Sequence, residues 1–220
     1  MLQNNTLQFL KNLQKNNNRP WFEANRKLYE AAKEDMAKFS QQIIDAVAVF
    51  DAPIGQLQPK DCMFRINRDV RFSKNKDPYK TNMGASFNAG GKKVNNAGYY
   101  FHCEPGQCFA AGGFYMPMPP ELTKIRQEID YNFNDWQAII GSKNFKKYFP
   151  KGVDGISTLV RPPKGYDENN AAIHYLKMKG FIVSRPLADD AVTNKSVVKE
   201  VVKTFEAMKP MIDFLNTAIK

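Results

Sequence analysis

Residues 60–80 hold the densest group of chemically useful side chains in the chain. Seven of them are Lys or Arg and three are Asp. Guanidinium and ammonium groups bind phosphate and carboxylate groups, so the segment predicts a site for an anionic small molecule. Asp69 is a weak catalytic candidate, as a carboxylate that orients water or a guanidinium. The predicted anion contacts in this segment are Arg65, Arg68, Arg71, Lys74, Lys76, Tyr79 and Lys80.

Apolar and polar side chains alternate from residue 62 to residue 72, which predicts a strand. Arg68 interrupts this pattern, because it falls on the apolar face with Phe64 and Ile66. A guanidinium there needs a carboxylate, several carbonyl groups or an anionic ligand. Arg65 and Arg71 fall on the other face, where they would form a platform for an oxyanion. Two interpretations stay open: an anion site and a structural network of salt bridges.

Two further places carry candidate residues. The proline-stiffened run 161–165 predicts Arg161 and Lys164 on one side of an extended ribbon, as phosphate contacts or as part of a solvated connector. His102 and Glu104 are two residues apart on a predicted strand and therefore share a face. They are weak catalytic candidates for acid–base chemistry, against a structural role for the histidine. With His174 as the only other histidine, we predict neither a metal site nor a cofactor.

The three cysteines are too few, and odd in number, for a disulfide framework, which predicts a reducing compartment and a cytoplasmic protein. Cys103 and Cys108 flank the turn at Pro105-Gly106 and should lie opposite each other on paired strands. Two interpretations are open for this pair. The thiols either form a redox switch or fill one face of the sheet as small buried side chains.

The formal net charge of +10 predicts attraction to polyanions and phosphorylated molecules. Nucleic-acid binding is therefore the main alternative function, and a structural or interaction module is the third. Aromatic residues that could stack on bases are Trp21, Phe22, Tyr79, Tyr99 and Tyr100. The sequence lacks a Walker loop, a dinucleotide fingerprint, a Gly-x-Ser-x-Gly elbow and a His-Glu-x-x-His helix. No apolar run reaches the length of a membrane-spanning helix, and the first residues do not resemble a secretory signal, so no membrane partner is expected.

The elements that must position these residues follow from hydrophobic spacing. Helical spacing predicts a first helix starting near Asn5, a second from Pro20 to Phe50, and a last one from Val197 that Pro210 kinks or breaks. Strands are expected within 61–118, two short helices after Pro119, extended pieces near 159–161 and 181–183, and a helix at 171–178. This order predicts an α+β fold: a mainly antiparallel sheet flanked by long N- and C-terminal helices, in a single domain over 1–220.

The sequence also resembles a known family. The run from Phe64 to Lys74, followed by Asp77-Pro78-Tyr79-Lys80, is similar to the signature of the domain of unknown function 2461 family. Similar pieces occur at 16–22, 98–102, 112–117, 126 and 161–166, so the resemblance spans nearly the whole chain. It implies one conserved domain, found widely in bacteria and some fungi, and carries over no activity, cofactor or catalytic residue. It points to the Arg-rich motif as the distinctive feature of the family.

Overall fold

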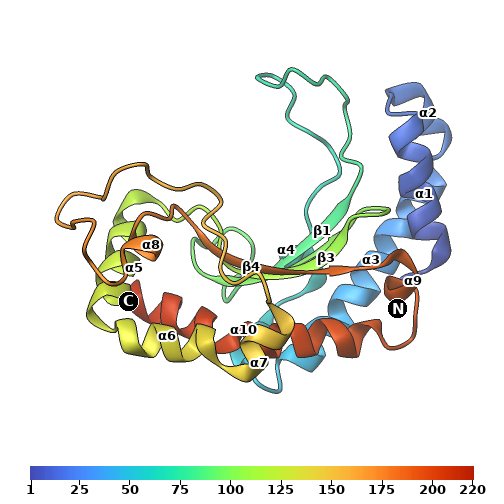
Figure 1. The fold of residues 1–220 in the computed structure, drawn as a ribbon. Helices are drawn as coiled ribbons and strands as arrows, with labels where there is room; N and C mark the ends of the chain where they lie inside the picture. The colour runs from blue at the N-terminus through green and yellow to red at the C-terminus, as the bar shows by residue number, and fades with distance from the viewer. The chain divides into compact units, whose positions relative to one another are not determined.

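The computed structural model describes residues 1–220. The helices, drawn in Figure 1, are α1 (Asn4–Lys15), α2 (Arg19–Ala24), α3 (Arg26–Val47), the 3-10 helix η1 (Ala52–Gln56), α4 (Pro59–Cys62), α5 (Pro119–Tyr131), α6 (Phe133–Gly141), α7 (Lys143–Tyr148), α8 (Ile173–Leu176), α9 (Asp189–Val192) and α10 (Val197–Ala218). The strands β1 (Met83–Phe87), β2 (Gly98–Cys103), β3 (Cys108–Phe114) and β4 (Phe181–Leu187) form one antiparallel sheet in that order. The predicted α+β class is confirmed.

The chain divides into two compact units. Unit 1 comprises residues 1–92, 100–110 and 186–203, and unit 2 comprises residues 93–99, 111–185 and 204–220. The strands β2, β3 and β4 and the helix α10 each contribute residues to both units. Each unit is described by itself below.

In unit 1 the predicted long second helix is interrupted at Asn25, which separates α2 from α3. The Asn18 side chain caps α2 by accepting the Trp21 N–H, and Pro20 occupies its first turn, as expected for a helix start. The Asn25 side chain donates to the Trp21 carbonyl (2.9 Å) and ends this short helix. The first helix starts at Asn4, and its N-cap residue, Gln3, makes no capping hydrogen bond with its side chain. Its apolar side, which includes Leu10, is buried, and α1 packs against α3.

The two faces of β2 have different environments. Phe101 and Cys103 are fully buried, and the Phe101 ring packs on Phe39 of α3 with ring centroids 4.7 Å apart. Tyr100 and His102 alternate with them and are only half-buried. Because side chains in a strand point alternately to the two faces, β2 presents one face to the helical core and leaves the other with partial solvent access.

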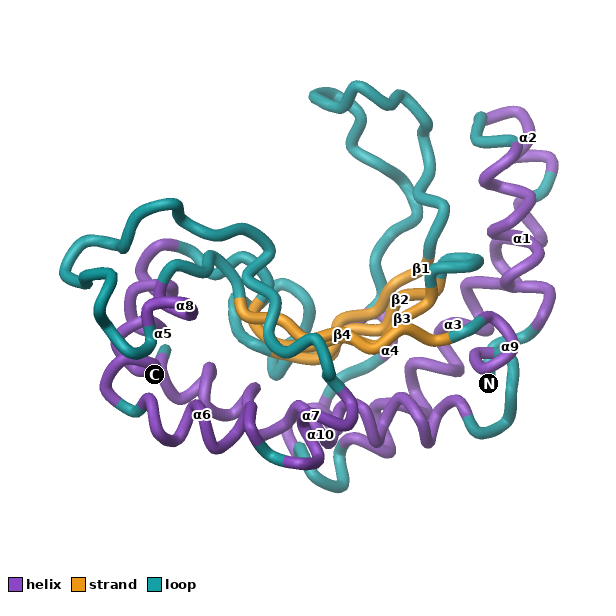
Figure 2. The backbone as a smooth tube through the Cα atoms, viewed as in Figure 1, coloured by secondary structure: helices purple, strands orange, loops and turns teal.

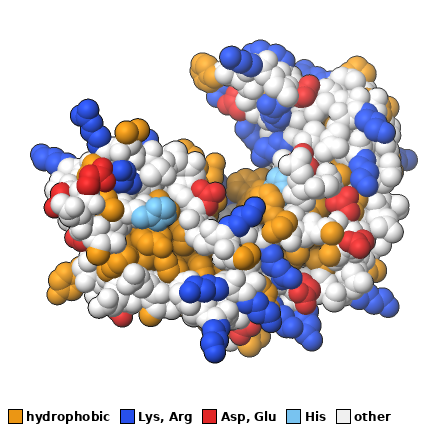
Figure 3. Space-filling model, viewed as in Figure 1, with side chains coloured by type: hydrophobic (Ala, Val, Ile, Leu, Met, Phe, Trp, Pro, Cys, Tyr) orange, Lys and Arg blue, Asp and Glu red, His pale blue; other side chains and the backbone are white.

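The strand predicted over 62–72 is wrong. Residue 62 ends α4, and residues 64–82 form a long irregular loop, drawn in teal in Figure 2. Only isolated bridges occur here, Met63 to Ala85 and Asn67 to Tyr79. The alternation fails because no continuous partner strand or apolar layer covers the segment: Ile66 is buried, whereas Phe72 is 96% exposed. We call residues 64–80 the basic loop, and Figure 3 shows several of its Lys and Arg side chains at the surface.

In unit 2, Trp136 of α6 lies at the centre of an aromatic core. Its ring contacts Tyr175, Phe181 and Phe214, with centroid distances of 5.5, 6.1 and 5.3 Å. The two helices predicted after Pro119 are confirmed as α5 and α6. The strand predicted near 181–183 is confirmed as β4.

Three other predictions for the C-terminal half differ from the structure. Residues 159–161 form no strand, since only Thr158 makes a bridge there, to Met178. Hydrophobic spacing predicts only two helices directly after Pro119, whereas the structure has a third, α7, which Ser142 caps by accepting the Phe145 N–H. The last helix runs through Pro210 without a break. None of the helices combines the length and apolar character needed to cross a membrane.

Candidate functional site

Three side chains of unit 1 form a hydrogen-bonded chain on the half-buried face of β2. The Tyr100 hydroxyl lies 3.1 Å from Nδ1 of His102, and Nε2 of His102 lies 3.2 Å from Oε2 of Glu104. The Thr81 hydroxyl, just before β1, donates to the other carboxylate oxygen of Glu104 (2.6 Å). The predicted common face of His102 and Glu104 is thus observed as a direct contact. We call these four residues the relay.

The carboxylate of Glu104 sets the tautomer of His102. An ionised carboxylate only accepts hydrogen bonds, so Nε2 of His102 must carry the proton that it donates to Glu104. Nδ1 of the neutral imidazole then carries a lone pair, and the Tyr100 hydroxyl donates to it. If the imidazole gains a proton, Nδ1–H donates to the Tyr100 oxygen, and the phenolic proton is free for another acceptor. The relay can therefore deliver a proton at the Tyr100 hydroxyl or receive one there.

Packing fixes the relay in place. The ring of Phe109 on β3 stacks on the imidazole of His102, with centroids 4.6 Å apart and planes 12° apart. Side chains of His102 and Glu104 keep exposed fractions of only 13% and 18%. Burial, followed by the nearby Glu104 carboxylate, raises the pKa of Tyr100 to about 12. The phenol is therefore protonated at neutral pH and can donate a hydrogen bond.

Two cations at the base of the basic loop lie close to one another. Lys80 is half-buried, with its ammonium 5.4 Å from the centre of the Phe64 ring, and that ring meets Tyr100 edge-on at 6.2 Å. Neither Lys80 nor Arg65 makes an ion pair. Burial, followed by the charge of Arg65, lowers the pKa of Lys80. Arg65 also acts on the Asp69 carboxylate, whose pKa its charge helps to lower. Lys80, partly desolvated and beside a like charge, is therefore the more favourable place for an anion.

The junction between α1 and α2 fixes the backbone of Tyr79, the residue that precedes Lys80. The Asn17 side chain donates to the Tyr79 carbonyl (2.9 Å) and accepts the Tyr79 N–H (3.1 Å). The Tyr79 ring is buried and stacks on Phe22, with centroids 3.9 Å apart. The Tyr79 ring, a predicted anion contact, is therefore part of the packed core, and Asn17 is a positioning residue that the sequence analysis did not identify.

The remaining basic residues of the loop have other partners. Arg68 donates to the Asp77 carbonyl (3.1 Å) and to the Ser73 hydroxyl (3.3 Å), so its hydrogen bonds connect residues within the basic loop. Its side chain contacts no buried carboxylate and lies on no apolar strand face, which corrects the sequence-based placement.

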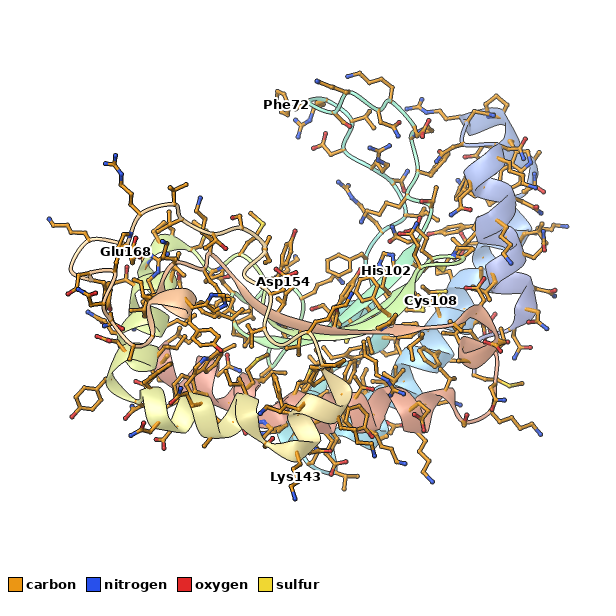
Figure 4. The ribbon with its side chains drawn as sticks, in the orientation of Figure 1. Phe72, His102, Cys108, Lys143, Asp154 and Glu168 are labelled. Carbon is orange, nitrogen blue, oxygen red and sulfur yellow. The ribbon has the colours of Figure 1, made fainter.

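Asp69 and Arg71 form an exposed ion pair with two hydrogen bonds of 3.0 and 2.7 Å. The Arg71 guanidinium holds the pKa of Asp69 below its usual value. Lys76 donates to the Val70 carbonyl (3.0 Å), whereas Lys74 is exposed without such a partner. The relay and the Asp69–Arg71 pair are therefore separate groups, and Figure 4 shows His102 on the sheet and Phe72 at the far tip of the loop.

Arg161 and Lys164 belong to unit 2. Both side chains are exposed, and neither makes an ion pair. The ribbon ends in a turn, in which the Tyr166 N–H donates to the Pro163 carbonyl (3.1 Å) and Gly165 has a φ of +93°. Arg161 and Lys164 therefore lie on the surface of unit 2, whereas the basic loop belongs to unit 1.

Sequence reasoning did not identify Thr81 as a site residue. Thr81 lies 23 positions before its partner Glu104, so no local spacing links them. The residue type of Tyr100 predicts only base stacking, but its place two residues before His102 on a strand puts both side chains on one face. The spacing of residues 100, 102 and 104 therefore predicts that the three side chains can form a hydrogen-bonded chain.

Comparison with models of protein families shows which family this chain belongs to. A family model described as "Conserved hypothetical protein (DUF2461)" matches residues 5–214. The chain belongs to the DUF2461 family. The match confirms the predicted resemblance and covers both units of the DUF2461 protein, including the relay and the basic loop. Comparison with curated proteins and with solved structures returned no match.

Proposed function

We propose that this DUF2461 protein is an enzyme that binds a small phosphorylated or carboxylated molecule beside the relay and exchanges a proton with it. One observation carries the proposal: the Tyr100 end of the hydrogen-bonded Tyr100–His102–Glu104 chain contacts the Phe64 ring. The other neighbour of that ring is Lys80, a partly buried cation that makes no ion pair. The relay supplies acid–base chemistry, and Arg65 and Lys80 supply the anion contacts.

The relay has the parts that a general acid needs. A protonated His102 donates from Nδ1 to the Tyr100 oxygen while Tyr100 gives its own proton to a leaving oxygen or a carbanion of the substrate. Glu104 stabilises the imidazolium through Nε2–H, and Thr81 holds the carboxylate in orientation. In the reverse direction, the same chain accepts a proton. Phosphoryl-type transfer fits this arrangement, since fixed cations stabilise oxyanion charge and a protonated leaving oxygen departs more readily.

Anion binding is tested by thermal unfolding with inorganic phosphate, pyrophosphate, sugar phosphates, nucleotides and small carboxylates. A ligand at 100 times its dissociation constant adds about 2.7 kcal/mol, a rise of about 5 °C or more for a chain of this length. The rise should disappear in Lys80→Met and Arg65→Gln. It should persist in Lys195→Met, which removes an exposed lysine of unit 1. Equal shifts in all three variants would contradict the assigned anion contacts.

The relay is tested by imidazole ¹⁵N NMR, because the chain has only two histidines. His174→Gln removes the exposed second histidine and assigns the signals of His102. We expect the Nε2–H tautomer for His102 and a change of its signals when the anion binds. An Nδ1–H tautomer would overturn the relay. With a substrate identified from the anion screen, Tyr100→Phe should lose turnover and keep the anion-induced rise in melting temperature.

Nucleic-acid binding is the second candidate, and one observation favours it. Phe72 is 96% exposed at the tip of the basic loop, and the guanidinium of Arg71 lies 5.8 Å from the centre of its ring. An exposed aromatic ring beside cations can stack on an unpaired base. Stabilisation by oligonucleotides alone, lost in moderate salt and in Phe72→Ala, would favour this function over the small-molecule site.

The free thiols and the composition further support our proposal of a cytoplasmic location.

A further inference from the structure

The β2–β3 hairpin places Cys103 and Cys108 opposite each other. A turn at Pro105-Gly106, in which Gly106 has a φ of +79°, is closed by the Gln107 N–H donating to the Glu104 carbonyl (2.8 Å). The next pair outward, Cys103 with Cys108, is therefore a non-hydrogen-bonded pair. Cα atoms of such pairs are about 4.5 Å apart, within the range that a disulfide spans.

The two thiols already contact each other. Both cysteines are free, and each thiol affects the pKa of the other. The Cys108 thiol in turn donates to the Glu104 carbonyl (3.1 Å). The interaction with Cys103 lowers the pKa of Cys108, whereas the same interaction and burial raise the pKa of Cys103 well above its usual value. Cys108 is therefore the thiol of this pair that ionises first.

The pair is buried close to the exposed end of the hairpin. Cys103 and Cys108 are 0% and 2% exposed, but the adjoining turn residues Gly106 and Gln107 are exposed. A molecule as small as hydrogen peroxide would have to enter where this end opens, at Gly106, whose N–H donates to the Asp189 carboxylate (2.8 Å). The third cysteine, Cys62, is buried in α4, and burial raises the pKa of its thiol to about 12, which makes it unreactive.

We propose that Cys103 and Cys108 form a reversible disulfide in the folded protein when it meets a hydroperoxide. The Cys108 thiolate attacks one peroxide oxygen, the O–O bond breaks, and the departing hydroxide takes up a proton to become water. The Cys103 sulfur then attacks the resulting sulfenic sulfur, the S–O bond breaks, and the S–S bond forms with release of a second water. The two thiols lose two electrons and two protons, and the peroxide is reduced to two waters.

The disulfide would act directly on the relay. Oxidation removes the Cys108 proton that the Glu104 carbonyl accepts, and Glu104 is the neighbour of Cys103 in sequence. Glu104 also carries the carboxylate that fixes His102. The formation of the bond does not depend on the function proposed above, whereas its effect on activity does.

The test counts free thiols in the folded protein after exposure to hydrogen peroxide, followed by quenching and denaturation. We expect the count to fall from three to one and to return to three with dithiothreitol, because sulfinic and sulfonic acids are not reduced by that reagent. In Cys62→Ser the number of free thiols should fall from two to zero, and Cys103→Ser should form no intramolecular disulfide. Peptide mapping of the wild-type protein should place the bond between residues 103 and 108, which needs no variant.

Three results would overturn the proposal: a count that stays at three, a loss that dithiothreitol does not reverse, or a mapped bond that includes Cys62. The imidazole spectrum of the oxidised protein provides a separate readout. Signals of His102 should shift on oxidation and those of His174 should not. Unchanged His102 signals with a mapped 103–108 bond would confirm the modification site and exclude its effect on the relay.

Discussion

The phenol of Tyr100 occupies the space in which a side chain at Gly84 would lie. A Cβ atom built on Gly84 of β1 would overlap the hydroxyl oxygen and crowd the ring carbons of Tyr100 on the neighbouring strand. A glycine in a strand interior often marks such a close approach. Gly84 therefore lets the Tyr100 ring lie across β1 with its hydroxyl at Nδ1 of His102.

Gly84→Ala should displace Tyr100 and break the first link of the relay. Insertion of a methyl group into filled space lowers the free energy of unfolding by about 1–3 kcal/mol. The imidazole signals of His102 should change at the same time, because Nδ1 loses its donor. Gly141→Ala is the matched control, since a Cβ there meets no atom within 4 Å. If both variants behave like the wild type, the packing of Tyr100 against Gly84 does not position the relay.

Asn17→Ala should loosen the base of the basic loop. The variant loses both hydrogen bonds to the Tyr79 backbone in a partly buried place, which lowers the free energy of unfolding by about 1–3 kcal/mol. Hydrogen exchange at the Tyr79 amide should accelerate more than the global loss of stability explains. Asn95→Ala, at an exposed position, is the control. An unchanged exchange rate at residue 79 would show that Asn17 does not hold the loop.

Arg68→Ala should free the tip of the basic loop and leave both units folded. The hydrogen bonds to Asp77 and Ser73 lie within the loop, so the expected decrease in the free energy of unfolding is only about 1–2 kcal/mol. Limited trypsin digestion measures the effect, because Arg71 and Lys74 become cleavable sooner. Lys74→Ala removes one cleavage site and no hydrogen bond, and serves as the control. Global unfolding of Arg68→Ala would instead indicate that a buried carboxylate had lost its partner.

Lys80→Met should weaken anion binding and slightly stabilise the free protein at neutral pH. Burial and Arg65 lower the pKa of Lys80 in the folded state below its ordinary value of 10.5. The unfolded chain therefore binds the proton more tightly, and the free energy of unfolding rises with pH between the lowered pKa and 10.5. The variant should lack this rise. Denaturant titrations of both proteins from pH 7 to about pH 10 measure the difference.

Anion affinity has the opposite pH dependence. Binding requires the ammonium form of Lys80, so the dissociation constant of phosphate should increase as the pH rises through the lowered pKa. Arg65 keeps its charge throughout this range, and the site should retain residual affinity. Affinity that is independent of pH up to 10 would mean that Lys80 does not contact the anion.

Several features of the DUF2461 protein followed from the sequence alone, because they depend on local spacing. The buried sides of α1 and α3 follow the helical repeat, and Pro119 marks the start of α5. The contact between His102 and Glu104 and the pairing of Cys103 with Cys108 follow from strand alternation and one short turn. Family membership likewise rests on local motifs, and the family match confirms it.

The placement of the arginines was decided only by tertiary structure. Alternation at 62–72 predicts a strand, but a strand needs a continuous partner, and the chain supplies only isolated bridges at Met63 and Asn67. Arg68 therefore bonds within its own loop and not on a buried face. Thr81 and Asn17 reach partners 23 and 62 residues away, and no sequence period encodes such contacts. Pairing and long-range hydrogen bonds depend on where the whole chain has folded, and the same folding brings the Phe64 ring into contact with both Tyr100 and Lys80.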